Sequence, residues 1–205
     1  MNGKAERFTS DEIKELAQKA KILDLHNHKS IEQKYREIIR AADKEARLLK
    51  REELTTLSQK SKINIQIVES VQDHADVLVE GAKQKLLEGN PELVEPGGAL
   101  FPAERANSCW RDCKHFFRLC CYAWAVGEPE LTNEQGMKAL GKLYKALSVP
   151  VPELLCALNE LKESTIEYCR SLDVGGESVA PCTQVLAQAF DILGRDLRQG
   201  LETTR

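Results

Sequence analysis

Hydrophobic residues recur along most of this chain at intervals of three and four, the spacing that places them on one face of an α-helix. The longest such series consists of Ile63, Ile67, Val71, Ala75, Leu78, Ala82 and Leu86. Short runs that alternate apolar and polar residues, which would indicate β-strands, do not compete with this pattern. We therefore predict an all-α protein.

Capping residues, prolines and glycines indicate where these helices begin and end. The residues expected to start helices are Ser10 with Asp11, Ser30, Pro102, the capping box Thr132–Gln135, Pro152 and Pro181. The predicted helices cover residues 11–25, 31–42, 51–61, 63–89, 102–126, 132–148, 152–172 and 181–201. The segment 90–98, rich in proline and glycine, should be a loop. No repeat or low-complexity linker divides the chain, so we expect one domain over residues 31–205, preceded by a helical extension over residues 1–30.

Composition excludes several classes of function. The 205 residues carry 29 basic and 32 acidic side chains, so the net charge of -3 gives no electrostatic reason to expect binding of nucleic acid or of an anionic membrane. The longest apolar stretch, around Cys120–Val126, is too short to span a bilayer. The polar N-terminus lacks the apolar core of a signal peptide. We therefore expect a soluble intracellular protein whose seven cysteines are thiols.

The cysteines do not form a recognisable metal-binding pattern. Cys109 and Cys113 are four residues apart and His115 is near, but a second Cys/His pair at the spacing of a zinc site is missing. We therefore predict no metal. Helical spacing places four other cysteines in the core, namely Cys120, Cys121, Cys156 and Cys169.

The segment from Pro91 to Gly127, PELVEPGGALFPAERANSCWRDCKHFFRLCCYAWAVG, resembles the chromophore region of phycobiliproteins, especially of their β subunits. In that family a PGG loop leads to a helix with an arginine, a chromophore cysteine within C-x-R-D, an R-x-x-x-Y segment and a glycine. The matching elements here are Pro96–Gly97–Gly98, Arg105, Cys109–Trp110–Arg111–Asp112, Arg118, Tyr122 and Gly127.

The resemblance continues on both sides and covers roughly residues 34–200. Upstream, AADKEARLL resembles a family segment whose aspartate, here Asp43, contributes to pairing between subunits. Downstream, GKLYKALSVP resembles another family segment, with Tyr144 in place. Cys182 falls where many β subunits carry a second bilin cysteine, although it could equally be an ordinary residue at a helix start. The resemblance implies the globin-like helical fold of the phycobiliproteins.

The resemblance also implies a cofactor, a covalently bound linear tetrapyrrole (a bilin of the phycocyanobilin type). Cys109 would form the thioether, and Asp112 would accept hydrogen bonds from the pyrrole N–H groups. Arg105 and Arg111 would pair with the two propionates, because an arginine fork suits a carboxylate better than lysine does. Without the resemblance, the two arginines and Asp112 would be interpreted as solvated helix surface, and Cys109 as a small apolar residue.

Several positions depart from the family pattern. Ala99 stands where the β subunits have an asparagine, and Glu104 where a second arginine is usual. Trp110 replaces a small aliphatic residue inside the motif, and Cys113 with Lys114 is also unusual. The stretch between Asp43 and the PGG loop is a few residues shorter, and residues 1–30 have no family equivalent. These departures indicate a divergent paralogue with an altered bilin site or a specialised partner.

The expected function is therefore non-enzymatic light harvesting and energy transfer. Asp43 and Arg118 would pair this chain with another phycobiliprotein subunit or with a second copy, beside other phycobilisome components. The expected location is the cytoplasm of a cyanobacterium, associated with the thylakoid, or a chloroplast stroma.

Three alternatives remain open. A paralogue that binds bilin loosely or not at all could act in phycobilisome assembly, turnover or regulation. A bilin lyase or reductase would need an acid–base pair in a cleft, and the sequence pattern identifies none. A haem-binding globin would need a proximal histidine, and none of the four histidines has that context. The colour of the purified protein separates the first alternative from the antenna subunit.

Overall fold

The computed structural model describes residues 8–172 and 179–202, with the side chains of the last helix described from Thr183 onward. Its elements are α1 (Ser10–Lys19), α2 (Gln33–Lys44), α3 (Arg51–Ser61), α4 (Ile65–Asp73), α5 (Ala75–Gly89), η1 (Pro91–Val94), α6 (Ala103–Val126), α7 (Glu134–Ala146), α8 (Val151–Ser171) and α9 (Val179–Glu202). The prediction of an all-α protein is confirmed. Within these described ranges, the only β-type pairing is one isolated bridge between Leu23 and Thr132.

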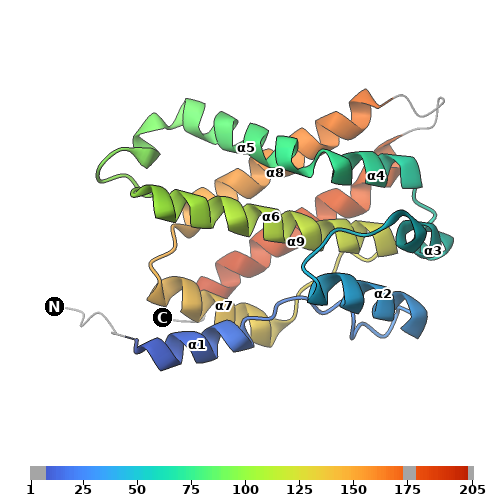
Figure 1. Cartoon of the computed structure of the whole chain (residues 1–205), viewed down its shortest axis with the longest axis horizontal. Helices are drawn as coiled ribbons and strands as arrows, with labels where there is room; N and C mark the ends of the chain where they lie inside the picture. The colour runs from blue at the N-terminus through green and yellow to red at the C-terminus, as the bar shows by residue number, and fades with distance from the viewer. Residues whose placement is uncertain (1–7, 173–178, 203–205) are drawn as a thin grey trace.

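The helix α6 is the centre of the core. In Figure 1, α6 and α9 pass through the middle of the molecule, with α4 and α5 above them and α1, α2 and α7 below. The second half of α6 is apolar almost all round, which is typical of a fully buried helix, and every residue from Leu119 to Val126 has no exposed surface. The helix ends at Gly127, whose φ of 71° lies in the left-handed region. A Cβ at Gly127 would also meet Ser61 Cβ at 3.0 Å.

The predicted helix 63–89 is interrupted at His74, so that α4 and α5 are separate elements. The side chain of His74 lies 2.9 Å from the carbonyl oxygen of Ser70 and 2.8 Å from the hydroxyl of Tyr168 on α8. A side chain that bonds to a carbonyl one turn back competes with the helical ladder at that point. The interruption therefore depends on a contact with another helix, which helical periodicity does not report.

Several predicted helix starts were wrong by a few residues. Thr9 rather than Ser10 caps α1, and it forms a capping box with Glu12. Asn133 caps α7 by accepting from Gly136 N at 2.7 Å, whereas Thr132, the expected cap, donates to Asp196. At each of these helix starts, two neighbouring polar residues could act as the N-cap. The contacts that each side chain makes in the folded protein determine which of the two does so.

Three further boundaries differ from the prediction. The hydroxyl of Ser30 bonds to Glu128 at 2.9 Å, and α2 begins only after Glu32. Pro102 is the N-cap of α6 rather than a residue of its first turn. The segment expected to be entirely loop contains the short helix η1.

The predicted helix 11–25 ends at Lys19, because the chain then runs beside the start of α7. Asp24 N donates to Leu131 O at 2.8 Å, and Asn133 N donates to Ile22 O at 2.9 Å. These backbone bonds replace the helical bonds of the predicted last turn.

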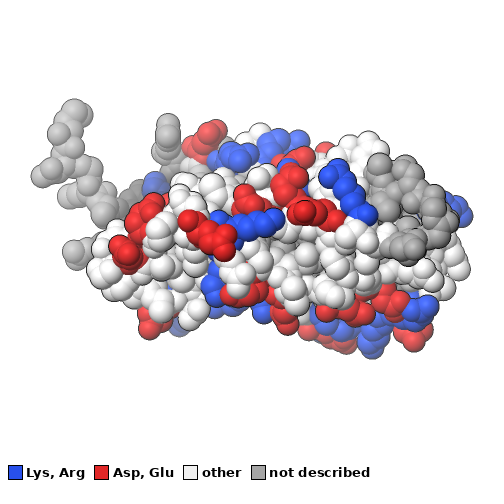
Figure 2. Space-filling view, turned by 90° about the horizontal axis from the view of Figure 1, so that it is seen from above, with Lys and Arg blue, Asp and Glu red and all other residues white. Residues whose placement is uncertain are grey.

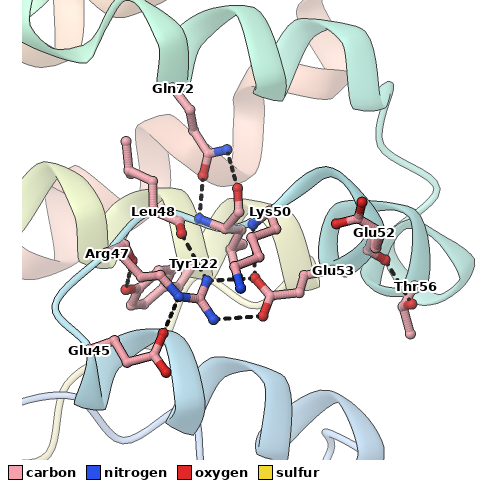
Figure 3. Close-up of polar contacts among 10 residues, drawn as sticks. Glu45, Arg47, Leu48, Lys50, Glu52, Glu53, Thr56, Gln72 and Tyr122 are labelled. Carbon is pink, nitrogen blue, oxygen red and sulfur yellow. Dashed lines mark hydrogen bonds and ion pairs between the residues drawn. The ribbon is translucent and has the colours of Figure 1, made fainter.

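The linker between α2 and α3 is held by polar side chains from three directions (Figure 3). Both guanidinium nitrogens Nη1 and Nη2 of Arg47 bond to the carboxylate of Glu53, at 2.7 and 2.8 Å. The amide of Gln72 pairs with both backbone groups of Leu49 at 3.0 Å. The hydroxyl of Tyr122, on the central helix, donates to the carbonyl of Arg47. The linker is therefore attached to α3, α4 and α6, which fixes the end of α2 on the core.

On the face seen from above, lysine and arginine side chains are interspersed with aspartate and glutamate (Figure 2). This face therefore carries no single-sign patch of the kind that attracts nucleic acid. None of the described helices is long and apolar enough to cross a bilayer.

Candidate functional site

A cavity of about 560 Å³ opens along the first half of α6 and contains most of the predicted site. Arg105, Cys109, Arg111 and Asp112 all line it. The spacing of Arg105, Cys109 and Asp112 on α6 explains their common direction, since residues three and four apart lie on one helix face. Arg111 lies off this face and reaches the cavity from its rim. The side chain of Cys182 lies outside the described residues.

The remaining walls of this cavity come from distant parts of the sequence. Helix α7 contributes Leu140, Leu143 and Tyr144, and the turn before α8 contributes Val149 and Pro150. These walls are apolar except for the hydroxyls of Tyr144 and Ser148. An apolar cavity with a few convergent polar groups is the usual form of a small-molecule site.

Cys109 is paired with a second thiol one turn further along α6. Cys109 and Cys113 are each only 2% exposed. The hydrogen bond between these thiols, together with burial, raises the pKa of Cys113 far above its usual range. Cys113 therefore stays protonated and can donate to the sulfur of Cys109.

Asp112 is the carboxyl group of the cavity, and Tyr144 is its partner. The hydroxyl of Tyr144 donates to Asp112 Oδ2 at 2.7 Å. Burial raises the pKa of Asp112, while this hydrogen bond and the charge of Arg111 lower it. The guanidinium of Arg111 is 3.9 Å from Asp112 Oδ1 but 76% exposed, so it lies at the rim. No acid–base pair in a cleft is evident from the sequence pattern, yet the fold brings this carboxyl and phenol together.

Replacing Tyr144 with phenylalanine should raise the pKa of Asp112 further above its ordinary value of 3.8, because the hydrogen bond that lowers it is lost. A carboxyl group whose pKa is higher in the folded state binds its proton more tightly there. The free energy of unfolding therefore falls as pH rises from 3.8 to the folded pKa, and Tyr144→Phe should extend that fall to higher pH. Carboxyl ¹³C NMR titration of Asp112 measures the shift.

The matched control is Tyr168→Phe, since the hydroxyl of Tyr168 bonds to Ser70 and His74 instead. An Asp112 titration unchanged by Tyr144→Phe, or changed equally by Tyr168→Phe, would contradict the assigned hydrogen bond.

Ala99 and Trp110 are two positions at which the sequence departs from the family pattern, and the structure shows where each one lies relative to the cavity. Arg105 Nη1 donates to the carbonyl of Ala99 at 3.4 Å, so the residue after the PGG loop is bonded to the helix through its backbone. Trp110 packs against the core and is not among the described residues that line the cavity. The bulky tryptophan therefore does not fill the space beside Cys109.

The two residues expected to bridge subunits meet within one chain. Arg118 Nη2 donates to Asp43 Oδ1 at 3.0 Å, and the side chain of Arg118 is only 11% exposed. The same nitrogen lies 3.1 Å from His115 Nδ1, which must accept because arginine has no acceptor. This contact attaches α2 to α6 and pairs the two charges without a partner chain, although Arg118 Nε is buried with no hydrogen-bond partner among the described residues.

The other cysteines are placed partly as predicted. Cys120, Cys121 and Cys169 are buried, as expected for core residues, whereas Cys156 is exposed and that prediction was wrong. Cys156 lies on α8 with its side chain exposed. Among the described residues, no group of three His, Cys, Asp or Glu side chains is arranged to hold a metal ion.

Sequence reasoning missed two features of the cavity. Tyr144 belongs to a segment that resembles the family's, but its pairing with Asp112 spans two helices and has no local signal in the sequence. Ala17, Ala20 and Ile22 also line the cavity, whereas the sequence predicts residues 1–30 only as a helical extension that precedes the domain.

Comparison with known proteins identifies a family. A family model described as "Phycobilisome protein" matches residues 37–197. The C-phycocyanin beta chain of Aglaothamnion neglectum is 24% identical over 157 residues, which are 75% of this chain and 90% of that protein. Allophycocyanin subunit beta-18 of Nostoc sp. is 30% identical over 135 residues, which are 66% of this chain and 76% of that protein.

The fold also resembles that of a protein whose structure has been solved. A far-red fluorescent biliprotein, derived from an allophycocyanin F subunit of Chroococcidiopsis thermalis, superposes with a TM-score of 0.53 at 23% sequence identity. The match covers 65% of this chain and 94% of the other. This likeness agrees with the predicted globin-like phycobiliprotein fold.

Proposed function

This chain belongs to the phycobilisome protein family, and from that premise we propose that it is a light-harvesting subunit holding a linear tetrapyrrole covalently at Cys109. The observation that carries the proposal is the convergence of Arg105, Cys109, Arg111 and Asp112 on one cavity. Family membership alone would not require these four side chains to face the same space.

The residues present fit a bilin. Sites for small molecules typically have volumes of roughly 300–1,000 Å³, and this cavity of about 560 Å³ lies within that range. Its walls are largely apolar, as an extended conjugated ligand requires. A thiol and a carboxyl group lie inside, and Arg105 and Arg111 can reach a ligand's carboxylates from the same helix.

Each polar residue has a distinct role in this proposal. Cys109 would hold the bilin by adding its S–H across an exocyclic C=C bond, with the sulfur bonded to one carbon, the proton on the neighbouring carbon and no leaving group. Cys113 donates a hydrogen bond to the Cys109 sulfur before attachment. Asp112, held by Tyr144, accepts from pyrrole N–H groups, and the two arginines pair with the propionates. The bound group supplies the light absorption, and the apolar walls keep it rigid and exclude water.

We place the chain with other phycobilisome components at the thylakoid, in a cyanobacterial cytoplasm or a chloroplast stroma. Its partner in this proposal is another phycobiliprotein subunit or a second copy. Because Asp43 and Arg118 already pair within the chain, a dimer formed through them would require this contact to be exchanged for one between chains.

The test of the proposal is co-expression of the wild-type chain with a bilin-synthesis system. Zinc-enhanced fluorescence of the denatured protein should reveal bilin that survives unfolding, which only a covalent bond permits. A chain that is purified colourless and remains dark on the denaturing gel would contradict the antenna function.

A second candidate is a paralogue that binds bilin loosely or not at all and acts in phycobilisome assembly, turnover or regulation. The contact between Asp43 and Arg118 favours it, because the residues expected to recruit a partner are occupied within the chain. Coloured native protein that loses its colour on denaturation would support this candidate over a covalent antenna.

A further inference from the structure

We propose that helix α1 and the residues after it are part of the bilin site, forming the wall of the cavity that faces Cys109 and controlling access to that thiol. This inference rests on the proposed function and adds to it, because α1 lies outside residues 37–197, where the family model matches. The wall would therefore distinguish this chain from a bilin site built by the family domain alone.

The geometry of the cavity carries the inference. Ala17 and Ala20 line the same cavity as Cys109, and so does Ile22, which is 3% exposed. Helix α1 runs beside α7 at the edge of the molecule (Figure 1), and α7 contributes the wall with Tyr144. The cavity is thus bounded by α6 on one side and by α1 with α7 on the other.

The small size of two wall residues keeps the space open. Ala17 and Ala20 each end at Cβ, so this segment can border the cavity without filling it. A large side chain at either position would project into volume that a ligand must occupy. The wall is therefore sensitive to side-chain size at these two positions.

The segment after α1 is firmly anchored. Asn133 Nδ2 donates to the carbonyls of Lys21 and Ile22, at 2.8 and 3.0 Å. Gly136 permits this close approach, since a Cβ there would lie 2.3 Å from Lys21 O. The chain is consequently held in one position at the C-terminal end of α1.

The helix itself is attached more weakly. None of the residues of α1 is buried, and its apolar Ile13 and Leu16 are only half-buried. An element with little buried apolar surface opens at a low cost in free energy. Helix α1 can therefore swing away from α6 about its anchored end to admit a ligand and then close over it.

The experiment measures access to Cys109 with and without bilin. In the full-length chain carrying Cys156→Ser, which removes an exposed thiol, Ala17→Trp should slow alkylation of Cys109 by a bulky fluorescent maleimide several-fold. Mass spectrometry of the digested protein assigns the label to Cys109. Gln18→Trp is the matched control, because Gln18 is exposed on the same helix and does not line the cavity. Circular dichroism verifies the fold, and Ala20→Leu serves as a milder second variant.

Slower labelling with Ala17→Trp or Ala20→Leu, together with less bilin attached on co-expression, would support the wall. Labelling of Cys109 at the wild-type rate in both folded variants would overturn it. The proposed function is judged separately, by whether the wild-type chain attaches bilin, so either idea can fail while the other stands.

Discussion

Replacing Cys109 with alanine is expected to abolish covalent bilin attachment on co-expression. No other described thiol lines the cavity, so none can take over the addition without moving. The cost in stability should be modest, about 1 kcal/mol for removing one buried sulfur atom from a site that already adjoins a cavity. Zinc-enhanced fluorescence of the denatured chain should therefore disappear while the folded protein is still produced.

Two further variants make this result specific. Cys156→Ala removes an exposed thiol outside the cavity and should leave attachment unchanged. Cys182→Ala tests the second predicted position, and partial loss of fluorescence there would indicate a second bilin. Fluorescence retained by Cys109→Ala but lost in Cys182→Ala would refute the assignment of the cavity.

Gly141→Ala is expected to destabilise the protein by about 1–3 kcal/mol, as overpacking of a close contact typically does. A Cβ at Gly141 on α7 would lie 2.2 Å from the carbonyl oxygen of Gly200 on α9. Both groups belong to backbones, so one helix must move. Since α7 carries Tyr144, the movement should also disturb the contact with Asp112. Urea unfolding followed by circular dichroism measures the loss of stability.

The control for this prediction is Gly194→Ala on α9, where the nearest atom to a new Cβ is Leu155 Cδ2 at 3.7 Å. That variant should be neutral, or more stable by up to about 1 kcal/mol, because alanine favours a helix over glycine. Equal stabilities of the two variants would show that the crossing of α7 and α9 is looser than the structure describes.

Local pattern predicted much of the fold. The helix over residues 51–61 was predicted with the bounds it has in the structure, and the helix predicted to end at Val126 does end there. The apolar stretch around Cys120–Val126 indicated the buried half of α6. Each of these features depends on residues within a few turns of one another, so periodicity and terminating residues were sufficient.

Features that depend on distant residues were not predictable in this way. The interruption at His74 depends on Tyr168, and the end of α1 at Lys19 depends on backbone bonds to the start of α7. Choosing between neighbouring caps such as Thr132 and Asn133 also required the partner Asp196. In each case a tertiary contact outweighed a weak local preference.

The same distinction between local and distant contacts applies to the candidate site. The sequence by itself, through its resemblance to a family, identified Cys109 and Asp112 on one face of one helix, because side chains three residues apart lie on the same side of an α-helix. Only the tertiary structure showed that Tyr144 bonds to Asp112 and that Arg118 pairs with Asp43 inside the chain. It alone brought Ala17 to the cavity of Cys109. These contacts join residues far apart in the sequence, and their geometry is determined by how the helices pack rather than by any pattern within one of them.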